Sequence, residues 1–584
     1  MKRFRSRSLL LGAAVLVASL LVSLAVAPGP SAHQTIFAPN GAVTAGHPLA
    51  AQAGLRILLQ GGNAVDAAVA TAATLSAVMP DMIGPLGSGY AVIYMAKSGE
   101  LAVVDMNGVA PKASSGEKLA EVLKQAGGGP RVRSGPMVRG PLSATVPGNL
   151  RGWEAMLDRY GKLSFKEVLQ PAIEYAEKGR PLDIEGAFHI RRYIPEIGIY
   201  ATWANIYLLN GNPPPPGHRL VMKDLAQTYK KVAAMGADVV YRGEVAKEIA
   251  RFFKEEGGWI TEEDLASYKV QWKTPITTTY RGYTIHGAPP TSSAITWMQA
   301  LKILEGVDLK AMGHNSPRYL HTVIEASKLA YLDGYRYVGD PGFVPVPVER
   351  MLSAEYATEL RAKIGERALV PQTYTAYTRP AGNPVGHSTT HMNVVDREGN
   401  VVSMTNTLGT FFGCGMVVGN TGMLCSDGID WFDVDKSPWT GQRSATAIEP
   451  GKRNRWTLSP AIIFKDGKPW MAIGGAGAET TMSGILQPIL NAIDFGMDVQ
   501  RANDAPRFVW GDVIHYTGGT KLQLEAAIPA NVRNELQAMG HDLVPLGDSP
   551  VPLVGNTNAI MYDPQTGAIM TGANLRGRDA AVGY

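Results

Sequence analysis

The chain has 584 residues, enough to bury a large core in roughly two to four domains or in one large two-part globule. It carries 55 Lys and Arg residues and 51 Asp and Glu residues, and its composition is otherwise that of an ordinary soluble enzyme. Four basic residues lie at the extreme N-terminus, and without them 51 basic residues balance 51 acidic ones. A near-neutral body lacks the basic surface with which proteins bind nucleic acid, so no nucleic-acid partner is predicted.

The N-terminus has the pattern of an export signal. Its basic residues precede an apolar run over residues 9–27, and a small-residue cleavage site lies at 23–25. We therefore assign residues 1–32 to a signal peptide and expect a periplasmic or extracellular protein. The run is long and Pro28 follows it directly, so an uncleaved membrane anchor is the alternative, and contact with a membrane is expected only in that case.

Helices and one hairpin are predicted near the start of the exported body. Small residues at 46–59 and 61–70 predict two helices joined by a Gly-Gly turn, because alanine favours helix and permits close helix packing. Residues 84–90 form a loop that opens a predicted strand at 91–95. A second strand at 101–105 completes a β-hairpin.

The middle of the chain changes from helical to irregular patterns. Residues 150–369 are predicted to be mainly helical, with amphipathic examples at 245–256 and 317–333. Residues 372–385 are rich in Thr, Pro and Gly and lack periodicity. We expect a flexible exposed strip there, which is where a cleavable bond should lie.

Strand patterns dominate the last third. Strands at 393–396 and 401–407 flank a polar turn, which places Thr389 and Thr407 on adjacent strands. A later hairpin over 461–473 leads into a glycine-rich loop at 474–478, and a helix follows at 480–496. Strand pairs flanked by helices predict a layered α/β fold, and the absence of a repeat of about 20–50 residues argues against solenoids and propellers.

The cysteines and histidines indicate no metal chemistry. Cys414 and Cys425 flank a glycine-rich turn, where they form either a hairpin disulfide in an oxidising compartment or two buried free thiols. The chain has no C-x-x-C and no H-E-x-x-H, and its 11 histidines are scattered rather than paired at ligand spacing. Neither a metal nor an organic cofactor is predicted.

The segment Gly-His-Ser-Thr-Thr-His at 386–391 carries the most chemistry in the chain. If the bond between Ser388 and Thr389 were cut, Thr389 would gain a free α-amine beside its own hydroxyl. A terminal α-amine titrates near pH 7.7–8.0 and can accept the hydroxyl proton, so one residue supplies both nucleophile and base. The alternative is plain strand chemistry, since two threonines before alternating valines also suit a pleated sheet.

Several segments in order and at matching spacing resemble the γ-glutamyltransferase (glutathione hydrolase) family. The resemblance covers most of residues 40–584 and is carried by residues 61–70, 389–391, 394–396, 399–400, 405–407, 459–460, 465–468, 474–477 and 505–508. Members of this family are autocleaving N-terminal nucleophile (Ntn) hydrolases with a four-layer αββα fold. The resemblance therefore implies an αββα sandwich formed by a heavy fragment, residues 33–388, and a light fragment, residues 389–584.

By this resemblance the reacting groups can be named. Thr389 would be the nucleophile released by self-cleavage, and Thr407 the neighbouring hydroxyl that positions its oxygen. The loop ending at Gly477 and Ala478 resembles the family's oxyanion hole, in which two backbone N–H groups face the tetrahedral intermediate. Ala478 replaces a family glycine but keeps its N–H. Without the resemblance this loop would equally suit an anion site or simple packing.

The residues that recognise a γ-glutamyl group are mostly replaced. Asn107 lies where the family has an arginine for the substrate carboxylate, and Gly409 lies where it has an asparagine. Asp430 persists but is followed by Trp431 instead of a carboxylate, and a serine pair is replaced by Trp456 and Thr457. Losing an Arg and an Asp contact together would weaken γ-glutamyl binding by roughly two to four orders of magnitude.

These replacements leave alternatives open. If this segment matched the family pattern one residue further along, Asp427 or Asp430 would hold the substrate amine. The two tryptophans are either stacking surface for a different acyl group or ordinary core. Three arginines that could replace the lost cation, or simply be solvated at the surface, are Arg443, Arg453 and Arg455.

We therefore predict an exported, self-processing threonine amidohydrolase. It would take an acyl group, by default γ-glutamyl, from a small-molecule amide and pass it to water or an amine. One alternative is an Ntn acylase for a non-γ-glutamyl amide, and another is a non-catalytic exported binding protein that keeps the fold. A Ser-His-Asp hydrolase is discounted, because no G-x-S-x-G nucleophile elbow is present at a strand-to-helix turn.

Overall fold

The computed structural model describes residues 34–126, 135–370, 387–437, 441–510, 521–545 and 555–584. The predicted leader, 1–32, and the predicted flexible strip, 372–385, lie outside these residues. Among the described helices, none combines the length and the apolar character needed to cross a membrane.

One seven-stranded antiparallel sheet carries the Thr389 segment in its centre. The order of its strands is β19 (Ala580–Gly583), β2 (Ala42–Ala45), β10 (His387–Val395), β11 (Val401–Thr410), β3 (Ser88–Met95), β4 (Glu100–Asp105) and β7 (Gln271–Lys273).

A second seven-stranded antiparallel sheet packs against the first. The order of its strands is β1 (Ile36–Ala38), β18 (Ile569–Gly572), β17 (Asn556–Tyr562), β13 (Lys468–Ala476), β12 (Ala461–Lys465), β9 (Tyr283–Gly287) and β8 (Ile276–Tyr280). Apolar side chains from both sheets fill the space between them, among them Val92, Val395, Ile462 and Ile560. Successive side chains of a strand point to opposite faces, so each strand can contribute to this shared core and to a helical layer at once.

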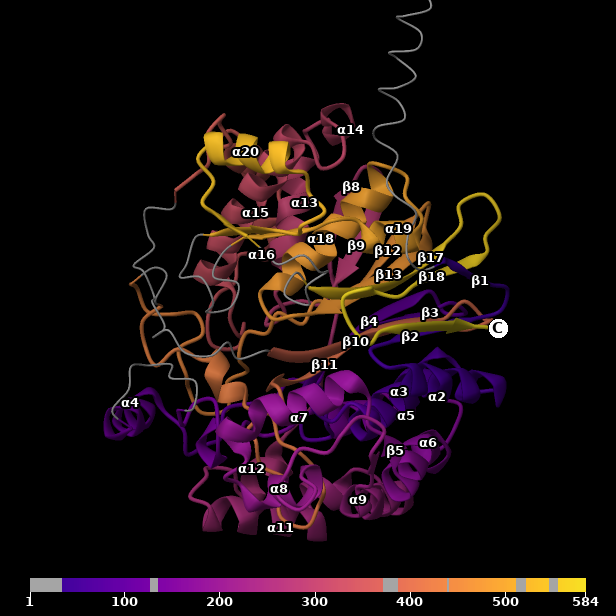
Figure 1. Cartoon of the computed structure of the whole chain (residues 1–584), viewed down its shortest axis with the longest axis vertical. Helices are drawn as coiled ribbons and strands as arrows, with labels where there is room; N and C mark the ends of the chain where they lie inside the picture. Colours follow the sequence, from indigo (N-terminus) through magenta and orange to yellow (C-terminus); the bar gives the residue numbers. More distant parts are fainter. Residues whose placement is uncertain (1–33, 127–134, 371–386, 438–440, 511–520, 546–554) are drawn as a thin grey trace, which may run out of the picture.

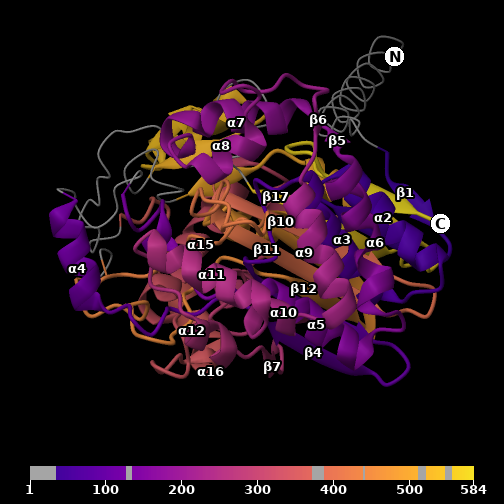
Figure 2. The same ribbon diagram turned by 90° about the horizontal axis from the view of Figure 1, so that it is seen from below.

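Helices cover the outer face of each sheet and complete four layers in the order α, β, β, α (Figure 1). This arrangement confirms the predicted αββα sandwich. The first sheet is covered by α2 (Pro48–Leu59), α3 (Ala64–Val78) and α5 (Asn149–Tyr160); α6 (Phe165–Lys178) packs on α3, and α9 (Lys223–Met235) packs on α6, as Figure 2 shows from below. The second is covered by α13 (Ala294–Leu304) and α18 (Thr480–Ile493), and α15 (Pro317–Tyr337) packs on α13.

The remaining elements are shorter or lie at the margins. The helices are α4 (Gly116–Gln125), α7 (Ile184–Ile197), α8 (Ala201–Tyr207), α10 (Asp238–Tyr241), α11 (Glu244–Glu255), α12 (Glu262–Ser267), α14 (Leu309–Met312), α16 (Val348–Met351), α17 (Ala354–Arg361), α19 (Val499–Asp504) and α20 (Ala530–Ala538), with 3₁₀ turns η1 (Pro141–Ser143) and η2 (Gly428–Trp431). Two small sheets pair β5 (Arg180–Pro181) with β6 (Arg219–Leu220), and β15 (Leu522–Leu524) with β14 (Phe508–Trp510) and β16 (Leu543–Pro545).

The prediction of a mainly helical stretch over 150–369 missed an edge strand of the first sheet and a hairpin of the second. Strand β7 of the first sheet and strands β8 and β9 of the second lie inside that stretch. The β8–β9 hairpin turns at Arg281 and Gly282, both of which have positive φ, as a two-residue hairpin turn of type I′ requires. The Thr-Thr-Thr-Tyr pattern before the turn alternates in burial and is the signal that could have identified the hairpin.

A network of polar caps ties α3 to the sheet that carries Thr389. Asn63 and Asp66 form a capping box at the start of α3, whose 15 residues are all buried. The Asp396 carboxylate, just past the end of β10, accepts the Ala64 N–H at 2.8 Å and the Asn400 side-chain amide at 2.8 Å. Two segments that carry the family resemblance, near residues 63 and 396, therefore meet and hold β10 against α3.

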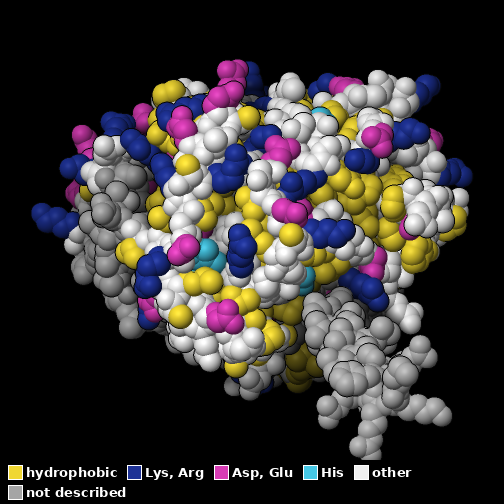
Figure 3. All heavy atoms as spheres, turned by 90° about the horizontal axis from the view of Figure 1, so that it is seen from above, with side chains coloured by type: hydrophobic (Ala, Val, Ile, Leu, Met, Phe, Trp, Pro, Cys, Tyr) yellow, Lys and Arg dark blue, Asp and Glu magenta, His cyan; other side chains and the backbone are white. Residues whose placement is uncertain are grey.

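Basic and acidic side chains are intermixed on the face shown in Figure 3. This distribution agrees, for that face, with the near balance of charge in the sequence.

Candidate active site

Thr389 and Thr407 face each other across neighbouring strands at the centre of the first sheet. Residue 389 on β10 pairs directly with residue 407 on β11, and a β-bulge separates Ser388 from Thr389 in the same ladder. The two side-chain oxygens are 3.0 Å apart. Thr407 is fully buried and Thr389 is 7% exposed, so the pair is shielded but reachable at Thr389. The predicted meeting of the two side chains is confirmed.

The Ser388 carbonyl, which belongs to the bond expected to be cut, lies between these two hydroxyls. It accepts a hydrogen bond from Thr389 Oγ1 at 2.7 Å and one from Thr407 Oγ1. The Gly409 N–H donates to Thr407 Oγ1 at 2.8 Å, which leaves the Thr407 proton directed at the carbonyl. The Ser388 hydroxyl donates to Thr410 O at 2.6 Å and holds the residue in place. A polarised carbonyl thus lies next to a hydroxyl nucleophile.

His391 is close in sequence but plays no part as a base for Thr389. Its ring nitrogens contact Thr405 Oγ1 at 2.7 Å and Asn393 Oδ1 at 3.0 Å. Complete burial lowers the pKa of His391 to about 3, so the ring is neutral. A Cβ added at Gly474 would lie 2.2 Å from this ring, so glycine allows β13 to pack directly on β10.

The Gly477–Ala478 loop connects β13 to α18. Both residues have positive φ, 126° and 51°, which turns the chain sharply before the helix. The Thr480 hydroxyl donates to Gly477 O at 2.7 Å, and a Cβ at Gly477 would lie 2.3 Å from that hydroxyl oxygen. Glu479, the next residue, forms an ion pair with Arg455 at 2.8 Å. The loop is therefore fixed at both ends, as pre-organised backbone donors require.

The predicted substrate residue Gly409 lies against the buried carboxylate of Asp427. Gly409 has φ of 104°, and a Cβ there would lie 1.8 Å from Asp427 Oδ1. Asp427 accepts the Thr410 N–H at 2.9 Å and contacts Thr410 Oγ1 at 2.5 Å. The space that an asparagine side chain would need at position 409 is thus filled by Asp427. Burial raises the pKa of Asp427 to about 7, although Arg139 opposes the shift.

Two predicted tryptophans form a pair beside this carboxylate. The rings of Trp431 and Trp456 are 4.8 Å apart at an interplanar angle of 44°. Trp456 is 1% exposed and belongs to the core between the sheets, while Trp431 is half-buried at its edge. Trp456 also approaches Gly409, since a Cβ at Gly409 would lie 3.4 Å from its ring. Core packing is thus the role of Trp456, and Trp431 is the member with accessible surface.

The other predicted substrate residues are buried in internal contacts. The side-chain amide nitrogen of Asn107 donates to Thr291 Oγ1 at 2.8 Å and to Tyr90 Oη at 3.1 Å, and the backbone carbonyl of Asn107 accepts from the Tyr268 hydroxyl. Thr457 is buried, and its carbonyl accepts from the Ser459 hydroxyl at 2.8 Å. Asp430 is buried on η2, three residues after Asp427.

Comparison with known proteins decides the family. The gamma-glutamyltranspeptidase family model matches residues 50–584. The chain belongs to the gamma-glutamyltranspeptidase family. Acylase ACY 1 proenzyme of Pseudomonas sp. (strain SE83) is 38% identical over 91% of each chain, and the glutathione hydrolase-like YwrD proenzyme of Bacillus subtilis (strain 168) is 33% identical over 94% of this chain and 100% of its own. The crystal structure of cephalosporin acylase from Bacillus halodurans superposes with a TM-score of 0.83 at 32% identity, covering 96% of this chain and 98% of that one.

Membership of the gamma-glutamyltranspeptidase family, with relatives named as hydrolase and acylase proenzymes, identifies the chain as an enzyme of the Ntn-hydrolase type. The alternative of a non-catalytic binding protein is therefore set aside.

The three arginines considered as replacements for the family's carboxylate clamp have partners of their own. Arg453 lies 3.5 Å from Asp105 and donates to Lys269 O at 2.8 Å. Arg455 pairs with Glu479 and lies 4.6 Å from the centre of the Tyr335 ring. The side chain of Arg443 is 69% exposed and 3.5 Å from Glu449. Of the three, Arg455 lies beside the Gly477–Ala478 loop, because its partner Glu479 directly follows Ala478 in the chain.

Arg139 and Lys273 are polar residues near the site that sequence reasoning missed. Arg139 is buried and donates to Thr410 Oγ1, Phe411 O and Gly413 O, so it braces the end of β11 beside Asp427. Lys273 Nζ lies 2.6 Å from the buried carboxylate of Asp105, two residues before Asn107. Neither residue belongs to a local motif, and only their contacts in the folded chain reveal them.

Cys414 and Cys425 are free, buried thiols in the structure, and the alternative of a hairpin disulfide is not observed. Burial raises the pKa of the Cys414 thiol to about 12, which keeps it protonated and unreactive.

Asp427→Asn should change the pH dependence of stability. The unfolded carboxyl titrates near pH 3.9, whereas the folded one has a pKa of about 7, so the native state retains a proton between these values. The stability that comes from the neutral carboxyl is therefore present at low pH and is lost as the pH rises through 7. We expect the thermal midpoint of Asp427→Asn to rise relative to the wild type between about pH 5 and pH 8. Asp466→Asn, in the exposed turn between β12 and β13, is the control and should follow the wild-type curve. Parallel curves for wild type and Asp427→Asn would contradict the assignment.

Proposed function

We propose that this chain is a self-processing amidohydrolase that cuts its own Ser388–Thr389 bond and then uses Thr389 as nucleophile. The cut divides the exported body into a heavy fragment, 33–388, and a light fragment, 389–584. The observation that carries the proposal is the Ser388 carbonyl held by the hydroxyls of Thr389 and Thr407. The basic and apolar start of the sequence supports export, with 1–32 as the leader.

Self-cleavage begins when Thr389 Oγ attacks the Ser388 carbonyl carbon. The Thr407 hydroxyl donates a hydrogen bond to the oxygen as negative charge develops there. The Thr389 nitrogen leaves and takes up a proton, so an ester joins Ser388 to the Thr389 side chain. Water hydrolyses this ester, leaving a carboxylate on Ser388 and both a hydroxyl and a free α-amine on Thr389.

The processed enzyme repeats the same chemistry on a substrate. The α-amine of Thr389 accepts the proton of its own hydroxyl as the oxygen attacks an amide carbonyl. The N–H groups of Gly477 and Ala478 stabilise the oxyanion, and the amine of the substrate leaves with a proton. Water or an acceptor amine then takes the acyl group from Thr389. The nucleophile, the base and the oxyanion donors in these steps are thus all groups of the chain itself.

Two acyl specificities are candidates. Relatives named as glutathione hydrolase proenzymes support a γ-glutamyl amide. The contact between Gly409 and Asp427 and the exposed edge of Trp431 support an acyl group without an α-amino-acid head, as do the acylase relatives. The second candidate is favoured because Asn107, in place of the arginine clamp, is engaged with Thr291 and Tyr90, while the neighbouring cations Arg453 and Lys273 pair with Asp105.

Thr389→Ala should abolish processing, because the attacking oxygen is removed. The expected result on a denaturing gel is a single uncut chain, whereas the wild type gives two fragments. N-terminal sequencing of the wild-type light fragment should begin at Thr389. Thr389→Ser keeps a hydroxyl and is the matched control, which should still be cut. A light fragment that begins at another residue would refute the mechanism.

Thr407→Val should slow processing by about 10²–10³-fold, because the side chain keeps its shape but loses the donor to the Ser388 carbonyl. The rate is measured from the loss of full-length precursor with time after purification. Thr407→Ser retains the donor and should process within about tenfold of the wild type. Equal rates for Thr407→Val and wild type would exclude a role for this hydroxyl.

A substrate panel should separate the two specificities. We expect the processed enzyme to hydrolyse simple N-acyl anilides with a kcat/KM roughly two to four orders of magnitude above that for a γ-glutamyl anilide. The uncut Thr389→Ala protein measures the background of every substrate. Faster turnover of the γ-glutamyl anilide would instead identify a glutathione hydrolase.

A further inference from the structure

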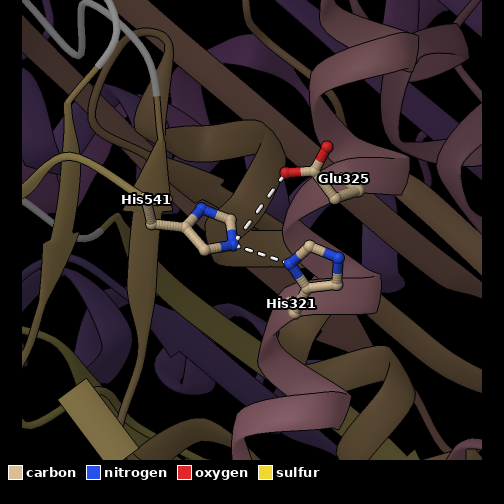
Figure 4. A group of neighbouring side chains, drawn as sticks. All are labelled: His321, Glu325 and His541. Atoms are coloured by element: carbon tan, nitrogen blue, oxygen red, sulfur yellow. Dashed lines mark hydrogen bonds and ion pairs between the residues drawn. The ribbon is translucent and has the colours of Figure 1, made fainter. Parts of the chain in front are cut away.

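A buried cluster of two histidines and a glutamate lies outside the Thr389 site. His321 and Glu325 are one turn apart on α15, and His541 follows α20 (Figure 4). His321 Nδ1 lies 2.9 Å from His541 Nε2, and Glu325 Oε1 lies 4.0 Å from the same nitrogen. The three atoms lie within 4.8 Å of one another, and all three residues are buried. Figure 4 shows the three side chains pointing toward a common centre.

Backbone contacts behind two of the side chains fix their orientation. His321 Nε2 lies 2.9 Å from Gly365 O, which can only accept, so this nitrogen carries the proton and Nδ1 presents its lone pair to the centre. The Leu369 N–H donates to Glu325 Oε2 at 2.8 Å, which leaves Oε1 directed inward. Ligands of protein-bound metals are held in this way, with the outer atoms of the imidazole and carboxylate bonded to backbone groups.

The third ligand atom is available through a change of tautomer. With Nδ1 of His321 as acceptor, His541 Nε2 is the donor between the two rings. Among the described residues, His541 Nδ1 has no hydrogen-bond partner. Moving the proton from Nε2 to Nδ1 therefore breaks no other bond and turns the Nε2 lone pair toward the centre. The ring remains neutral throughout.

The ammonium group of Lys328 already pairs with Glu325, the carboxylate of this cluster. Its Nζ lies 2.7 Å from Glu325 Oε1 and 3.1 Å from Leu369 O, and 5.5 Å from the centre of the Trp510 ring. If Glu325 Oε1 bound another cation, the ammonium would keep the Leu369 carbonyl and the face of Trp510. Lys328 is thus a competitor whose removal should favour a metal.

We propose that His321 Nδ1, His541 Nε2 and Glu325 Oε1 bind a divalent transition metal of the zinc type. Two imidazoles and one carboxylate suit Zn²⁺ and its neighbours rather than Mg²⁺ or Ca²⁺, which prefer oxygen ligands throughout. Metal–ligand distances of about 2.0–2.2 Å in a tetrahedron separate ligand atoms by about 3.3–3.6 Å. The observed 2.9 Å and 4.0 Å lie on either side of this range, and the third pair, His321 Nδ1 and Glu325 Oε1, lies within 4.8 Å, so side-chain shifts of about an ångström complete the site.

Such a metal would connect the two fragments of the processed enzyme. His321 and Glu325 precede the proposed cut and His541 follows it, so the ion would join heavy and light fragments. This connecting role rests on the proposed function, whereas the metal site itself does not.

The test uses the processed protein with both fragments present. A chelator first removes bound metal, and the protein is then titrated with ZnCl₂ and, separately, with CoCl₂. We expect one metal per chain and visible d–d absorption of Co²⁺ typical of low coordination. His321→Gln and His541→Gln should each weaken Zn²⁺ binding by more than about 100-fold, because each removes a ligand nitrogen. His314→Gln, which alters another partly buried histidine that lies just before α15, is the control and should bind as the wild type does.

A further variant, Lys328→Met, should change Zn²⁺ affinity in the opposite direction to the histidine variants. It removes the competing ammonium, so Zn²⁺ should bind at least about tenfold more tightly than to the wild type. Zinc should also raise the thermal midpoint of the processed wild type and of Lys328→Met, but not that of His541→Gln. Absence of stoichiometric binding to the wild type, or binding unchanged in both histidine variants, would overturn the proposal. Cutting at Thr389 reports separately on the proposed function.

Discussion

The proposed chemistry depends on the Ser388 carbonyl being held by two threonine hydroxyls, and that contact depends on the register of β10 with β11. An antiparallel ladder places residues 389 and 407 directly opposite each other, and its bulge lies between Ser388 and Thr389, at the carbonyl that accepts from both hydroxyls. The Gly409 N–H then sets the direction of the Thr407 proton. A one-residue slip in this register would move every one of these groups to the other face of the sheet.

Much of the surrounding structure holds that register. Asp396 fixes the end of β10 to the first turn of α3, and Arg139 holds the end of β11 through three oxygen atoms. Gly474 permits the second sheet to contact His391 directly, so the two sheets pack with β13 against β10. Buried polar groups of this kind favour one arrangement, because each alternative would leave a donor or acceptor without a partner.

The acyl pocket differs from the pattern expected of a γ-glutamyl site through packing as well as through sequence. Position 409 is held as glycine by the Asp427 carboxylate, and Trp456 fills the core behind it. Asn107 is engaged with Thr291 and Tyr90, while Arg453 and Lys273 both neutralise Asp105. A substrate carboxylate at this place would have to compete with Asp105 for the same two cations.

The sequence alone was sufficient for the layered α/β class, the hairpin that carries Thr389 and Thr407, and the family, because these depend on local periodicity and on motifs read along the chain. It missed the β8–β9 hairpin within a stretch dominated by helical patterns. The contact of Asp427 with Gly409, the bracing by Arg139 and the grouping of His321 and Glu325 with His541 were decided only by the tertiary structure. Each of these contacts joins residues from separate segments of the chain. Such residues become neighbours only when the elements pack, so no local sequence pattern predicts the contact.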